Sequence, residues 1–158
     1  MPTDDFEGFD WDEDDADDEE IRREMEVERQ RIKNLPLMKK AEEIFELTQA
    51  IVETIDEADD VLLMREQMLS NAMMLMPKIA GAESGDLYTL RMENAVIIKI
   101  HARELLTQTS FCKAEGLSET HYLQMLRKEI DAFRQLFVEW VKGFDKNNDI
   151  PDDWGLFY

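Results

Sequence analysis

The chain has 158 residues, of which 44% are hydrophobic and 35% are charged. This length and this apolar share suffice for one globular core with tails. Only 6 Gly and 4 Pro occur, which is sparse for a β-rich protein, whereas a high charged fraction is typical of long exposed helices. The composition therefore favours an all-α fold.

The formal net charge of −19 argues against two classes of partner. Nucleic acids and anionic membrane surfaces attract proteins through basic patches, whereas this chain fits a basic protein partner, or solubility alone. The single cysteine, Cys112, cannot form an intramolecular disulfide, and neither a signal peptide nor a membrane span is visible in the sequence. We therefore expect a cytoplasmic protein without a membrane segment.

Residues 1–20 contain twelve Asp or Glu and no Lys or Arg, so they carry −12 of the −19 and leave −7 for the rest. Such a segment repels itself and buries little apolar area, which predicts a disordered acidic tail. Phe6, Phe9 and Trp11 stand among the acids. Aromatic residues in an acidic segment are typical of short docking motifs, so these three are candidate partner-binding residues. The alternative is that they are merely tolerated.

Four amphipathic segments follow a predicted helical lead-in at residues 21–35. Apolar residues recur every three or four positions from Pro36 onward, which predicts helices at about 36–55, 60–83, 86–114 and 118–143. Asp86 and Ser118 are the expected N-caps of the third and fourth helices, and Pro77 should kink the second or end its regular hydrogen bonding. Short connections between long helices predict an up-down-up-down four-helix bundle over residues 36–143.

Residues 144–158 form an acidic and aromatic tail. This tail either folds back over the bundle or presents an apolar peptide to another molecule, and folding back is favoured because exposed aromatic residues lower solubility. Its candidate partner-binding residues are Trp154, Leu156, Phe157 and Tyr158.

Metal sites are disfavoured by the spacing of the candidate ligands. Di-iron bundles need Glu-x-x-His on two helices, and neither His101 nor His121 has Glu three residues before it. His101 has Glu104 on the same helical face, but a core histidine bonded to Asn94 or to a neighbouring helix is the favoured interpretation. Residues 145–149 begin like a calcium loop, with Asp, Asn and Asp in alternation, yet the required Gly and Glu that should follow are absent.

Nucleophilic and cofactor chemistry is also not indicated. Cys112 lies near the end of a predicted helix, where the dipole disfavours a thiolate, and no glycine-rich phosphate loop, nucleophile elbow or zinc spacing occurs. The sequence therefore predicts a protein that is not an enzyme and has no cofactor. Five of the ten methionines lie in the second predicted helix, and a packed core is favoured for them over a promiscuous binding groove. They are Met64, Met68, Met73, Met74 and Met76.

Residues 36–142 resemble a family of four-helix bundles first noted in 23S rRNA intervening sequences, which includes accessory proteins of diversity-generating retroelements. The resemblance is carried by QMLSNA at 67–72, by MPKIAGAESG at 76–85 and by RELLT at 103–107. It implies an α bundle, a homo-oligomer that is often pentameric, and a basic surface for nucleic acid. The family's paired arginines are Ser70 and Asn71 here, the Asn that follows its proline is missing, and the net charge is opposite, so the resemblance alone does not predict nucleic-acid binding.

Three hypotheses follow. The first is a non-enzymatic interaction or adaptor protein whose acidic tails dock a basic protein partner. The second is an RNA- or ribosome-associated bundle, which depends on the resemblance and on a local basic cluster in residues 22–40. The third is a small metal-binding bundle, which the ligand spacing disfavours.

Overall fold

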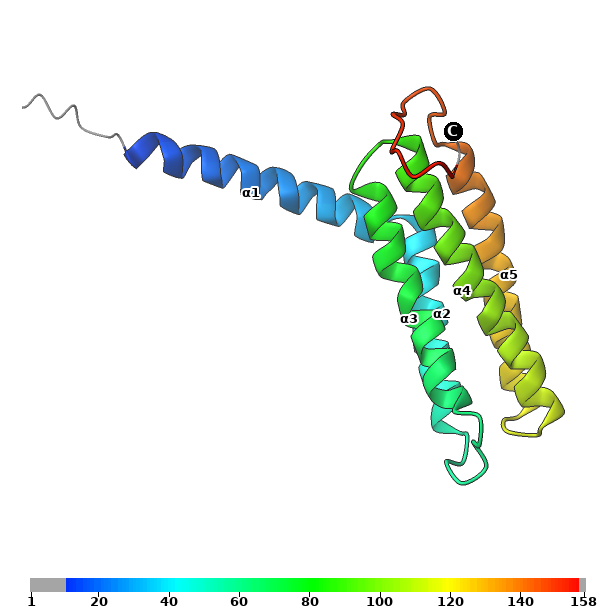
Figure 1. The fold of residues 1–158 in the computed structure, drawn as a ribbon. Coiled ribbons are helices and arrows are strands. Elements are labelled where there is room, and N and C mark those ends of the chain that lie inside the picture. Colours follow the sequence, from blue (N-terminus) through cyan, green and yellow to red (C-terminus); the bar gives the residue numbers. More distant parts are fainter. Residues whose placement is uncertain (1–10, 157–158) are drawn as a thin grey trace, which may run out of the picture. The chain divides into compact units, whose positions relative to one another are not determined.

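A computed structural model describes the backbone of residues 11–156 and the side chains of residues 17–156. Five α-helices and no strand lie within this part of the chain, which confirms the predicted all-α class (Figure 1). The helices are α1 (Trp11–Lys33), α2 (Pro36–Glu53), α3 (Met64–Glu83), α4 (Tyr88–Ala114) and α5 (Thr120–Lys142).

The chain divides into two compact units at residues 34 and 35. Helix α1 belongs to the first unit. It begins at Trp11, ten residues before the expected lead-in at 21–35, so the expectation of a tail without regular structure does not hold for residues 11–20. Residues 1–10, with Phe6 and Phe9, lie outside the described residues.

Local interactions stabilise the described part of α1. Arg31 and Lys33 stand in its last turn, where the helix carries a partial negative charge. The ion pair between Arg23 and Glu19, four residues apart, adds a small contribution on the helix surface.

Helices α2 to α5 form the second unit, called here the four-helix unit. Successive helices run in opposite directions (Figure 1). Helix α2 contacts α3 and α5, and α4 contacts the same two helices. The core between them is almost entirely apolar, with fully buried side chains from every helix. Its largest members are Ile44, Ile51, Met68, Leu75, Ile79, Ile98, Leu105, Leu123, Leu126 and Phe133.

The expected N-caps of the third and fourth predicted helices are wrong. The residue before α4 is Leu87, which makes no side-chain cap, and the Thr89 backbone N–H donates instead to the Asp149 carboxylate at 3.1 Å. Helix α5 follows Glu119. The hydroxyl of Ser118 instead lies 2.9 Å from the hydroxyl of Thr54, the residue that follows α2. In both places the helix starts one or two residues later than the sequence suggests.

Helix α3 also starts late, at Met64, because a side chain four residues upstream supplies its cap. The buried carboxylate of Asp60 accepts the backbone N–H groups of Met64 at 2.7 Å and Arg65 at 3.0 Å. The chain enters the helix through Leu63 in the left-handed region, with φ of 57°, a conformation that costs leucine roughly 1 kcal/mol. Helix α3 then runs through Pro77 without ending.

None of the helices in the described part of the chain is long and apolar enough to cross a membrane.

Candidate interaction surfaces

The outer face of α3 is an apolar surface of the four-helix unit, and we call it the α3 face. It consists of two rows of residues spaced four apart, which lie side by side on a helix. One row is Leu69, Met73, Pro77 and Gly81, and the other is Glu66, Ser70, Met74 and Lys78. Six of these residues, from Glu66 to Pro77, line a shallow depression of about 450 Å³.

The outward positions of α2 and α5 provide a comparison, whereas α4 also exposes apolar residues, namely Leu90, Val96 and Ile100. In α2 they include Lys39, Glu43, Glu46 and Glu53, and in α5 most are charged or carry amides. On α3, Glu66 is the only charged residue among the six exposed positions, and Met73 is 53% exposed. A helix that is apolar on its outer as well as its inner side is normally covered on both.

The methionines of α3 therefore divide between core and surface. Met64 and Met68 are buried, as expected for core packing, whereas Met73 is exposed and Met74 and Met76 are half-buried. The prediction that all five pack in the core is right for the first two and wrong for Met73. The prediction fails for Met73 because a helix that is apolar nearly all round has no sequence pattern that separates its buried side from its outer side.

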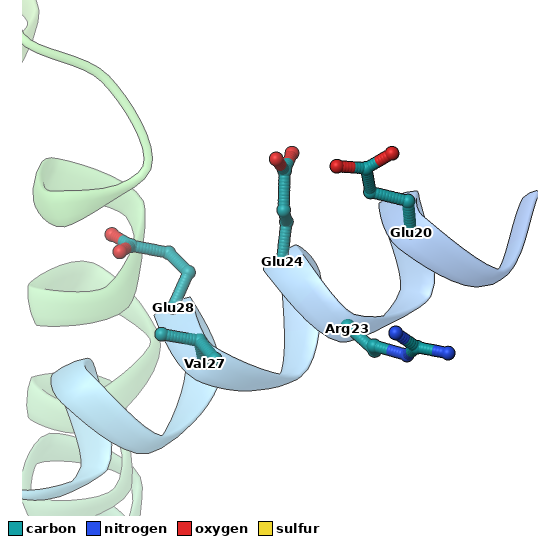
Figure 2. Close-up of a pocket in the computed structure, with 5 residues that line it drawn as sticks. All are labelled: Glu20, Arg23, Glu24, Val27 and Glu28. Atoms are coloured by element: carbon teal, nitrogen blue, oxygen red, sulfur yellow. The ribbon is translucent and has the colours of Figure 1, made fainter. Parts of the chain in front are cut away.

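Helix α1 carries a second candidate surface, an acidic row of Glu20, Glu24 and Glu28. These three side chains project from the same side of the helix, next to Val27 and away from Arg23 (Figure 2). Glu20 and Glu24 make no hydrogen bond or ion pair with any described residue. A hydrogen bond from Arg31 lowers the pKa of Glu28. Like charges four residues apart repel one another, so this row favours a cationic partner.

The basic residues of α1 are mostly paired within the helix. Arg23 pairs with Glu19, Arg29 with Glu26 and Arg31 with Glu28. Because these cations are offset by neighbouring carboxylates, α1 does not present the continuous basic stripe that phosphate backbones require.

The polar residues between α3 and α4 form a hydrogen-bonded row. His101 Nδ1 lies 2.8 Å from Asn71 Oδ1, and Asn71 Nδ2 donates to Gln108 Oε1 at 3.0 Å. The favoured interpretation of His101, a histidine bonded to a neighbouring helix, is confirmed, but its partner is Asn71 and not Asn94. Asn94 instead donates to its own helix at Leu90. Every buried polar atom of this row has a partner, so it is a structural contact between helices.

The single cysteine is enclosed by apolar side chains. Cys112 is fully buried, and its Sγ lies 3.6 Å from Met68 Sδ. Burial, with a smaller contribution from the negative charge of Asp60, raises the pKa of Cys112 to about 11. A thiol that stays protonated is a poor nucleophile and a poor metal ligand.

Residues 144–149 fold back onto the start of α4, as expected for the C-terminal tail. Phe144 is buried, its ring lies 4.0 Å from the Arg91 guanidinium carbon, and the Asn148 carbonyl accepts the Tyr88 N–H at 2.9 Å. The tail beyond this point differs. Trp154 and Leu156 are 83% and 71% exposed. Both residues were predicted to contact a partner, and both are accessible to one.

The remaining predicted contact residues fall at the edges of the structure. Phe157 and Tyr158 lie outside the described residues, and Trp11 lies in α1, where its side chain is not described. The calcium-like sequence at 145–149 has other uses: Asp145 accepts the backbone N–H of Asn147, and Asp149 caps α4. Among residues 17–156 no group of three or more metal-ligating side chains comes together.

Comparisons with known proteins add no family: no protein-family model matches the chain, and neither does any curated protein.

Proposed function

We propose that this chain is a non-enzymatic, cytoplasmic interaction protein that docks a basic protein partner through its acidic N-terminal segment. In this proposal the four-helix unit is an up-down-up-down bundle that serves as a stable body. The observation that supports it best is the acidic row of α1. Helix α1 forms a separate unit, and the carboxylates of Glu20 and Glu24 have no partner among the described residues.

The energetics of α1 favour a role in binding. Most helical stability in proteins comes from tertiary packing, and no described side chain of α1 is buried, so α1 is only weakly stabilised by itself. A cationic partner would neutralise the repulsion along the row and stabilise the helix in the same step. Attraction between opposite net charges also raises association rates, in a manner that salt suppresses. Trp154 and Leu156 are the proposed second contact, because they are exposed at the other end of the chain.

The test compares two variants that change the net charge equally. In the first, Asp17→Asn, Glu20→Gln and Glu24→Gln remove three exposed carboxylates from α1. In the second, Glu46→Gln, Glu53→Gln and Glu115→Gln remove three exposed carboxylates from the four-helix unit. Each full-length variant is immobilised, and the proteins that it retains are compared over a salt gradient.

We expect the unchanged chain and the second variant to retain the same basic proteins, with release at moderate salt. The first variant, and a chain without residues 1–20, should lose them. Identical partner sets for all four chains would overturn the proposal.

No observation favours the RNA-associated alternative, since three of the four arginines of α1 are paired with glutamates. The relationship to the 23S intervening-sequence bundles remains a proposal from sequence resemblance. Filter binding of RNA with a clear salt dependence would revive it.

A further inference from the structure

The α3 face carries opposite charges at the two ends of one row. Glu66 begins this row and Lys78 ends it, with Ser70 and Met74 between them. The two charged residues are twelve positions apart, which corresponds to about 18 Å along the helix axis. Neither side chain forms a hydrogen bond or ion pair within the described part of the chain, whereas the other two charged residues of α3 do: Arg65 bonds Val52 and Glu83 bonds Arg91.

A row with this order of charges is complementary to itself. When two copies of the row pack against each other in opposite directions, each Glu66 meets the Lys78 of the other copy, and the uncharged middles of the two rows lie together. Rows spaced four apart are also the ridges that interlock in the commonest class of helix packing. Opposite orientation is the arrangement that a two-fold axis produces, because such an axis brings the same surface of both copies together.

We propose that the α3 face is the interface of a two-fold symmetric homodimer, in which α3 packs against α3 of a second copy and Glu66 pairs with Lys78 across the axis. The proposal goes beyond the partner-binding role of α1 and uses none of its residues.

The side chains at the centre of the face suit this contact. Met73 and Met74 are flexible apolar residues that fill irregular gaps, and Ser70 is small enough for two helices to approach closely. At the end of the face, Gly81 lies against α4, since an added Cβ would lie 3.1 Å from Asn94 Oδ1. Because α4 lies so close there, its edge can extend the interface.

The area that the α3 face can bury limits the expected affinity of the dimer. Stable complexes bury roughly 800 Å² on each partner, which is more than a single helix supplies. Leu90 is 52% exposed and lies on the edge of α4 next to Asn94, so it can add to the interface, as can Ile97 one heptad further on. We expect a dissociation constant on the order of micromolar for a contact of this size.

The test is a charge exchange in the full-length chain. Sedimentation equilibrium measures association from about 1 µM to about 300 µM, the range over which a micromolar dimer dissociates. Glu66→Lys and Lys78→Glu each place two like-charged pairs across the axis and should weaken the dimer by about tenfold or more. The double variant Glu66→Lys/Lys78→Glu restores opposite pairs and should return the dissociation constant to within about threefold of the unchanged chain.

Two further variants separate the α3 face from other surfaces. Met73→Glu should abolish dimer formation over the same range. Val138→Glu places the same charge at a comparably exposed apolar position on α5 and should leave association unchanged. Thermal unfolding of each variant establishes that it is folded.

Several results would overturn the dimer. They are a monomer at every concentration, an oligomer that Met73→Glu does not affect, or a double variant no better than the single ones. The α1 variant that lacks three carboxylates should dimerise normally, so failure of the dimer and failure of partner docking are distinguishable.

Discussion

At the scale of single residues, one buried carboxylate connects three helices. Glu83, at the end of α3, accepts a hydrogen bond from Arg91 of α4 at 2.8 Å and another from the indole N–H of Trp140 on α5 at 2.6 Å. Its side chain is only 7% exposed and that of Arg91 is 18% exposed. Removal of one partner from such a pair leaves the other charge in a poorly solvated place.

The first prediction is therefore that Glu83→Ala lowers the free energy of unfolding by about 3 kcal/mol, because Arg91 loses its counter-ion in a mostly buried position. Urea denaturation followed by circular dichroism measures this change. Glu139→Ala is the matched control, since its ion pair with Lys142 is exposed and should contribute less than about 0.5 kcal/mol. Equal losses in the two variants would contradict the assigned role of Glu83.

The second prediction concerns Cys112 and alkaline pH. Burial raises the pKa of this thiol from its ordinary value of 9.0 to about 11. The unfolded chain therefore loses the thiol proton at lower pH than the folded chain does. The stabilising contribution of the protonated thiol is complete below pH 9 and is lost as the pH rises towards 11.

Cys112→Ala has no thiol to titrate. Between pH 9 and pH 11, the free energy of unfolding of the unchanged chain should therefore fall relative to that of this variant. Urea denaturation at a series of pH values measures the difference, and the comparison removes the effects of Lys and Tyr titration. A difference that does not change between pH 8 and pH 11 would show that the thiol is not held in its protonated form.

At the scale of elements, the segment after α5 caps the N-terminus of α4. The Asp149 carboxylate accepts the backbone N–H of Thr89 at 3.1 Å and its hydroxyl at 2.6 Å. This is the role that a capping residue adjacent in sequence normally plays, and here it is supplied from sixty residues away.

The third prediction is that Asp149→Ala costs about 1 kcal/mol of stability, as for loss of an N-cap, and releases the segment that carries it. Trypsin should then cleave after the exposed Lys146 faster than in the unchanged chain. Asp152→Ala is the control, because Asp152 bonds only the backbone N–H of Trp154 in its own turn. A cleavage rate at Lys146 that is the same in both variants would argue against the cap.

The sequence predicted the elements better than their ends. Apolar periodicity located all four helices of the second unit, because regular burial on one side leaves a regular pattern. Asp86 and Ser118 were plausible caps by residue type, but the structure caps α4 with Asp149 and uses Ser118 in a contact with Thr54. Such contacts depend on tertiary packing, and a local sequence pattern does not predict which distant residues will meet.

The same reasoning applies to the candidate surfaces. The acidic segment was visible from composition alone, although its helical part was not expected to begin at Trp11. The α3 face was missed, since the exposed Met73 and the buried Met68 belong to the same apolar run. One sequence signal did exist: α3 has only four charged residues in twenty positions, too few for a helix with a solvated outer side.

At the scale of the whole molecule, the division at residues 34 and 35 separates two kinds of stability. The buried apolar residues of the described chain all lie between Leu37 and Phe144, so none comes from α1. Helix α1 depends on its own backbone and its surface ion pairs, which contribute little.

The fourth prediction is that deletion of residues 1–34 leaves the unfolding of the four-helix unit cooperative and its midpoint within a few degrees of the full chain. The helical signal should fall by about a fifth, in proportion to the residues of α1. Circular dichroism during thermal unfolding measures both quantities. Loss of the cooperative transition would mean that α1 is part of the same folding unit.

The exposure of Met73 also has a chemical consequence. Its thioether is open to peroxide on the α3 face, while that of Met68, on the inner side of the same helix, is fully enclosed. Oxidation adds a polar sulfoxide to a surface that otherwise offers thioethers and a proline ring. Mild oxidants should therefore alter the α3 face before they disturb the fold, and a methionine sulfoxide reductase should reverse the change.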